Sequence, residues 1–134
     1  MTLAVVVAAA ALLLSSAQDG RWSGRLDGSE AAKVSFQVAR DGHRIKNFRT
    51  TVSAFCVGPS IETNRIQIFV VAVPSARVRP NGRFSKVYVP NGEDGGEYRI
   101  SGTLRGSRVR DGKVEVNVST CGGRDEWTAR RARR

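Results

Sequence analysis

Glycine preceded by aspartate or asparagine recurs along this chain and divides it into short segments. These dipeptides readily adopt the positive φ angles of tight hairpins, so they favour type I′ turns between alternating apolar runs. We expect turns at Asp19-Gly20, Asp27-Gly28, Asp41-Gly42, Asn81-Gly82, Asn91-Gly92 and Asp111-Gly112. This pattern predicts an antiparallel all-β protein and says nothing about chemistry.

Alternation of apolar and polar side chains places strands between these turns. The inward faces that we expect are Trp22-Gly24-Leu26, Val34-Phe36-Val38, Tyr98-Ile100-Gly102-Leu104 and Val114-Val116-Val118. No eleven-residue window after residue 17 shows helical periodicity. About eight or nine strands in a chain of this size predict a single-domain antiparallel β-sandwich or flattened barrel.

Two local features refine this prediction. The spacing of Ile45 and Phe48 breaks the alternation, which indicates a β-bulge near Lys46-Asn47. We expect Val109 and Val114 to lie on the two strands of a hairpin that turns at Asp111-Gly112.

The segment from Ile66 to Val73 is apolar apart from Gln67. A strand that is apolar on both faces predicts a central position with cover on each side. The alternative is that a partner chain covers one face.

Small residues follow both tryptophans at a spacing of two, in Trp22-x-Gly24 and Trp127-x-Ala129. Because interiors are close-packed, each large indole needs a small neighbour on its own face. We expect the first and last strands to share a sheet and the two tryptophans to lie near each other in the core. The alternative is that the indoles are half-exposed platforms for a ligand.

Residues 1–17 are predicted to be a signal peptide, and residues 18–134 a single domain. Ala4 to Leu14 is uninterrupted apolar sequence, and Ser15 and Ala17 suit a cleavage site before Gln18, although no Lys or Arg precedes the apolar stretch. The stretch is short for a membrane span of roughly 20 residues. We therefore expect a secreted or cell-envelope protein, with an uncleaved anchor as the alternative.

The two cysteines, Cys56 and Cys121, suit an oxidising compartment, where a disulfide is the default. Two buried free thiols are the competing interpretation. A metal site is disfavoured because neither cysteine has a His or second Cys at ligand spacing.

The formal net charge of +10 favours anionic partners. Residues 65–134 hold fifteen basic and seven acidic side chains, against seven and five in residues 1–64. Since eighteen of the twenty-two basic residues are arginine, the codon usage of a GC-rich genome is an equally good explanation. We expect the anionic ligand site at Arg77, Arg79, Arg83, Lys86, Arg105, Arg108 and Arg110, with further arginines at 124, 130, 131, 133 and 134.

Catalytic candidates are few. His43, the one histidine of the sequence, is expected on an exposed turn without an orienting partner. Glu62, Glu97 and Glu115 lie in or beside predicted strands and are more typical of solvated faces than of a glycosidase pair. Asn91, Glu93, Asp94 and Glu97 match no established calcium loop.

Several segments together resemble a group of small secreted β proteins of actinobacteria and related high-GC bacteria. They are Trp22-x-Gly24, Val34-x-Phe36-x-Val38, Gly42-x-x-Ile45-x-x-Phe48, Cys56, Gly82-Arg83-Phe84-Ser85, Tyr98-x-Ile100-Ser101-Gly102-x-Leu104-x-Gly106, Cys121 and Trp127-Thr128-Ala129-Arg130-Arg131. The resemblance spans nearly all of residues 18–134 and implies an exported, disulfide-containing β-sandwich-like domain with no assigned activity.

The sequence therefore favours an exported, non-enzymatic binding or surface-interaction module with a basic face and no cofactor or metal. The expected partner is an anionic polymer or membrane surface, with no specific nucleic-acid recognition. One alternative is a small hydrolase that uses carboxylates on cell-envelope polymers. Another is an oligomeric structural protein with one face of Ile66 to Val73 as its interface.

Overall fold

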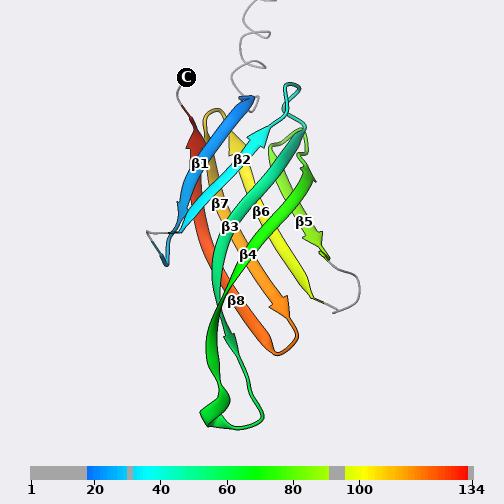
Figure 1. Cartoon of the computed structure of the whole chain (residues 1–134). Helices are drawn as coiled ribbons and strands as arrows, with labels where there is room; N and C mark the ends of the chain where they lie inside the picture. The colour runs from blue at the N-terminus through cyan, green and yellow to red at the C-terminus, as the bar shows by residue number, and fades with distance from the viewer. Residues whose placement is uncertain (1–17, 30–31, 91–95, 133–134) are drawn as a thin grey trace, which may run out of the picture.

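A computed structural model describes residues 18–29, 32–90 and 96–132, which form eight antiparallel strands and one short 3-10 helix (Figure 1). The strands are β1 (Gly20–Leu26), β2 (Lys33–Val38), β3 (Arg44–Cys56), β4 (Arg65–Arg77), β5 (Arg83–Tyr88), β6 (Glu97–Arg105), β7 (Arg108–Val118) and β8 (Cys121–Arg131). The 3-10 helix η1 (Ile61–Thr63) lies between β3 and β4.

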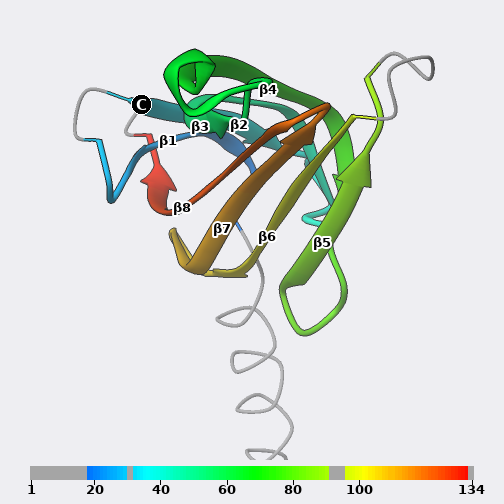
Figure 2. The ribbon, with the colours of Figure 1, turned by 90° about the horizontal axis from the view of Figure 1, so that it is seen from below.

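The strands form one curled sheet in the order β4-β3-β2-β1-β8-β7-β6-β5. Seen end-on, β1–β4 make one layer and β5–β8 make the other (Figure 2). Pairing of β1 with β8 joins the layers along one side, and a bridge between Val78 and Phe84 joins them beside the β4–β5 turn. The result is a single-domain, flattened antiparallel barrel, which confirms the predicted fold class.

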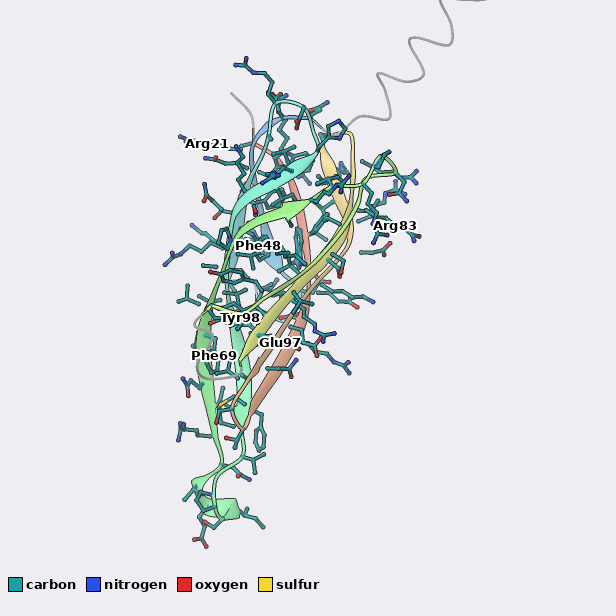
Figure 3. All side chains as sticks on the ribbon, turned by 90° about the vertical axis from the view of Figure 1, so that its right-hand side faces the viewer. Arg21, Phe48, Phe69, Arg83, Glu97 and Tyr98 are labelled. Atoms are coloured by element: carbon teal, nitrogen blue, oxygen red, sulfur yellow. A yellow bond between two sulfur atoms is a disulfide. The ribbon has the colours of Figure 1, made fainter. Side chains whose placement is uncertain are left out.

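Aromatic rings fill the space between the layers, where Figure 3 shows Phe48. Trp22 and Trp127 are each 1% exposed, and their ring centroids lie 5.6 and 5.8 Å from that of Phe36. Leu26 of β1 stands opposite Trp127 of β8. The prediction of neighbouring buried tryptophans on paired terminal strands is therefore confirmed.

Glycine closes two of the predicted turns, but not in the predicted conformation. Gly42 has φ of 76° and donates its N–H to the carbonyl of Ala39, and Gly82 has φ of 85° and donates to Arg79. The residue before each glycine has no positive φ, as a type I′ turn would require. Each glycine instead occupies the last position of a four-residue turn, where its conformational freedom lets the chain enter the next strand.

Bulges break the alternation in β3 and in β7. The bulge predicted near Lys46-Asn47 is confirmed, since Asn47 has φ of 54° and the β2–β3 register shifts there. The hairpin predicted at Asp111-Gly112 is wrong, because β7 continues through it. Asp111 has φ of 55° and makes a second bulge. The positive φ that we expected in a turn therefore occurs in a bulge.

The apolar run from Ile66 to Val73 lies in β4, which is at one end of the sheet order and not at its centre. Val71 and Val73 point into the core, whereas Ile66 and Ile68 are exposed on the outer face. The expectation of cover on both sides is therefore wrong for a single chain.

The predicted disulfide is present. Beyond the short β1–β2 hairpin, β3 and β8 pair directly, with Phe55 opposite Gly122 and Cys56 opposite Cys121. The two sulfur atoms are bonded at 2.03 Å, across a sequence separation of 65 residues. Loop-closure entropy gives such a bond roughly 4 kcal/mol of stabilisation. It anchors the base of the β3–β4 hairpin, whose green tip projects beyond the barrel (Figure 1).

The predicted signal peptide, the Asn91-Gly92 turn and most of the acidic cluster at residues 91–97 lie outside the described residues. Of the residues that are described, none forms a helix long and apolar enough to cross a membrane.

Candidate functional site

The outer face of β5, β6 and β7 carries basic side chains together with hydroxyl side chains. Phe84 and Gly102 are buried on the inner face, so the intervening side chains point outward. Register places Arg83 of β5 beside Thr103 of β6, and Thr103 beside Arg110 of β7. The backbones of Arg83 and Arg110 are therefore two strand spacings apart, roughly 10 Å, with Thr103 between them.

A second row on the same face has small hydroxyls opposite one another. Ser85 stands beside Ser101, and Ser101 stands beside Lys113. Short side chains between long basic ones leave two adjoining hollows, of about 400 and 350 Å³, that share Arg83, Thr103 and Asp111. We call this surface the basic groove and define it by Arg79, Arg83, Ser85, Ser101, Thr103, Arg105, Arg110, Asp111 and Lys113.

A third row continues the basic surface toward β8. The two-residue turn at Gly106-Ser107 sets Arg105 opposite Arg108, and Arg108 also stands opposite Arg130. Neighbouring strands are about 4.8 Å apart, so three arginines occupy adjacent positions across β6, β7 and β8 with no acidic residue between them. Like charges directly opposite each other in a sheet are destabilising.

Ion pairing does not neutralise this surface. In the described part of the chain, the two ion pairs are Arg99 with Glu97 at 3.0 Å and Arg131 with Asp19 at 3.7 Å. Asp111 lines both hollows but lies within ion-pair distance of no basic group among the residues described. Free guanidinium forks beside hydroxyl donors are suited to phosphate, sulfate or carboxylate oxygens.

The structure brings together four of the seven basic residues expected from the sequence, Arg79, Arg83, Arg105 and Arg110. Arg108 lies next to them, opposite Arg105. The other two are placed elsewhere. Arg77 stands opposite Arg44 in the register of β3 and β4. Lys86 stands opposite Ile100 and alternates onto the same side of β5 as the buried Phe84.

Sequence reasoning missed the hydroxyl floor of the groove and its lysine. Ser101 and Thr103 belong to the polar side of the clearest alternating strand, so their exposure was readable. What the sequence did not show is that Ser85 and Lys113 lie beside Ser101, because that requires the register of three strands.

The arginines expected near the C-terminus are dispersed. Arg124 stands opposite Glu115, Arg130 belongs to the third basic row, and the side chain of Arg131 donates to the carbonyl oxygen of Asp19 at 2.6 Å. Positions 133 and 134 lie outside the described residues.

The carboxylate candidates for hydrolysis lie outside the basic groove. Glu97 is paired with Arg99, and Glu115 accepts a hydrogen bond of 3.2 Å from Asn117. Glu62 lies in η1 at the hairpin tip, and His43 is exposed on the β2–β3 turn, as expected. Within the described ranges, no three His, Cys, Asp or Glu residues group closely enough to hold a metal ion.

No protein-family model matches the chain, and comparisons with curated proteins and with solved structures found no match. The chemistry of the basic groove is therefore the basis for assigning a function.

Proposed function

We propose that this protein is an exported, non-enzymatic binding module that holds an anionic polymer in its basic groove. The observation that carries the proposal is the set of guanidinium groups without carboxylate partners around a floor of Ser85, Ser101 and Thr103. Codon usage would explain the number of arginines, but not their gathering around a hollow lined by hydroxyls.

The shape of the groove favours a chain over a flat surface. Two adjoining hollows extend along the outer face of β5–β7, so successive anionic groups of one polymer would each meet a basic side chain. The hydroxyls would donate hydrogen bonds to the oxygens between the charges. The disulfide supports export, because such bonds persist in oxidising compartments.

The test is salt-dependent retention on immobilised heparin, a polymer that carries sulfate and carboxylate groups. Replacing Arg83, Arg105 and Arg110 with Gln removes three charges from the groove. A matched control replaces Arg21 and Arg25 of β1 and Arg40 of the β2–β3 turn, which are exposed, so that the same net charge is removed.

We expect the groove variant to bind on the order of tenfold more weakly than the control variant, at about 0.5 kcal/mol per lost contact. It should also elute at lower salt, because exposed charge interactions are screened. Equal elution of the two variants would show that net charge alone drives retention and would refute the site. Retention on anionic vesicles without retention on heparin would refute the polymer as ligand.

A further inference from the structure

The β3–β4 hairpin carries several exposed apolar side chains on the outer face of its strands and at its tip. Phe55 stands opposite Ile66, and they are 50% and 64% exposed. Ile68 is 68% exposed and Ile61, at the tip, is 88% exposed. We call this surface the apolar stripe and define it by Phe55, Val57, Ile61, Ile66, Ile68 and Val70.

The size of the stripe is close to that of a protein interface. Its exposed surface is on the order of 600 Å², at the upper limit of the apolar patches that soluble monomers usually show. A standard interface buries about 800 Å² per partner, so the stripe and its immediate border would provide enough area for one stable contact.

Charge is distributed along this face in a way that fits a second copy of the same face. From Ile66 to Ala76 the strand carries no charged side chain. The basic residues Arg49 and Lys46 stand opposite Ala72 and Ser75, at the barrel end of the hairpin. Glu62 is exposed at the tip.

Antiparallel packing of two hairpins brings these opposite charges together. Glu62 lies before β4 begins, on one side of Ile68, and the partners of Arg49 and Lys46, Ala72 and Ser75, lie on the other side. A twofold axis near Ile68 therefore sets Glu62 of each copy toward the basic end of the other, whereas Arg65 stands opposite Cys56 on the other face of the hairpin. A twofold interface requires this kind of self-complementarity.

We propose that two copies of the chain form a twofold dimer by packing their apolar stripes face to face, with the hairpins antiparallel. The basic groove is on the other layer of the barrel, formed by β5–β8 (Figure 2), so the dimer would leave both grooves free. The proposal stands independently of the groove's function.

Sedimentation equilibrium of the purified protein tests the dimer directly. We expect twice the mass of one chain, and we expect Ile68→Glu to weaken the dimer at least about thirtyfold, as loss of a central contact does. Ile68→Thr keeps a β-branched residue in the strand and should weaken the dimer less than Ile68→Glu does. The matched control is Val87→Glu on β5, where the valine is 47% exposed outside the stripe, and this variant should remain a dimer.

A charge exchange tests the antiparallel orientation. Glu62→Arg should weaken the dimer a few-fold, and adding Arg49→Glu to the same chain should restore it, since an exposed charge pair contributes up to about 1 kcal/mol. A double variant weaker than either single variant would refute this orientation.

Other occupants of the stripe would give different results. A monomer at all concentrations would overturn the proposal. If the protein is a monomer that co-sediments with phosphatidylcholine vesicles, and Ile68→Glu abolishes this vesicle binding, a lipid bilayer covers the stripe instead. Ile68→Glu and Val87→Glu having equal effects would show that association does not use the stripe.

Discussion

At the scale of single residues, Gly24 sets how closely β1 and β8 approach. A Cβ built there would overlap the carbonyl oxygen of Thr128 and lie 2.6 Å from the Cα of Ala129. Both are backbone atoms of β8, so no side-chain rotation can make room. The indole of Trp127 instead uses space left by Gly112 of β7, where a Cβ would lie 2.7 Å from the ring.

We predict that Gly24→Ala lowers the free energy of unfolding by about 3 kcal/mol, because the two strands must separate. Urea denaturation followed by tryptophan fluorescence measures this. Gly122→Ala is the control, since its nearest neighbour, the Asn117 side-chain oxygen, lies 3.9 Å away. That change should stay within about 0.5 kcal/mol, and equal losses in both variants would contradict the steric argument.

For the two tryptophans, the residue-scale expectations are right about burial and wrong about what surrounds the rings. The spacing Trp22-x-Gly24 was interpreted as an indole beside its own gap. The gap at Gly24 in fact admits the backbone of β8, and Trp127 fits beside a glycine from another strand. Neighbours within a strand can be read from the sequence, but neighbours across strands depend on register.

At the scale of strands, the same local chemistry serves different purposes. Asp111 has a positive φ, as a turn residue would, yet it forms a bulge inside β7. Similarly, the apolar run in β4 predicts cover on both faces, but in the single chain Ile66 and Ile68 are exposed on the outer face. In both cases the sequence predicts the local requirement, and the tertiary structure decides how it is met.

The row Arg105–Arg108–Arg130 crosses three strands and carries three unneutralised charges. We predict that Arg108→Gln raises the free energy of unfolding by about 0.5 kcal/mol at low salt, because it relieves repulsion on both sides. The gain should shrink at about 1 M salt, where the screening length falls to about 3 Å. Urea midpoints at low and high salt check this, and a loss of stability at low salt would contradict it.

At the scale of the molecule, the flattened barrel separates two surfaces of opposite character. The basic groove lies on the layer formed by β5–β8, and the apolar stripe lies on the hairpin that extends from the other layer (Figure 3). The sequence predicted the fold class, the disulfide and most of the basic residues of the groove. It did not predict the groove itself. Arg83 and Arg110 lie on either side of Thr103 because of the order and register of β5, β6 and β7, which the sequence does not show.

The most direct test of the anion-binding account is a two-dimensional NMR titration of the purified protein with a heparin-derived oligosaccharide, with neutral dextran as control. We predict saturable shifts of the backbone amides of Arg83, Ser101, Thr103 and Arg110, with little change in β1 and β2 and none with dextran. Shifts spread evenly over all exposed arginines, or confined to the β3–β4 hairpin, would contradict the account.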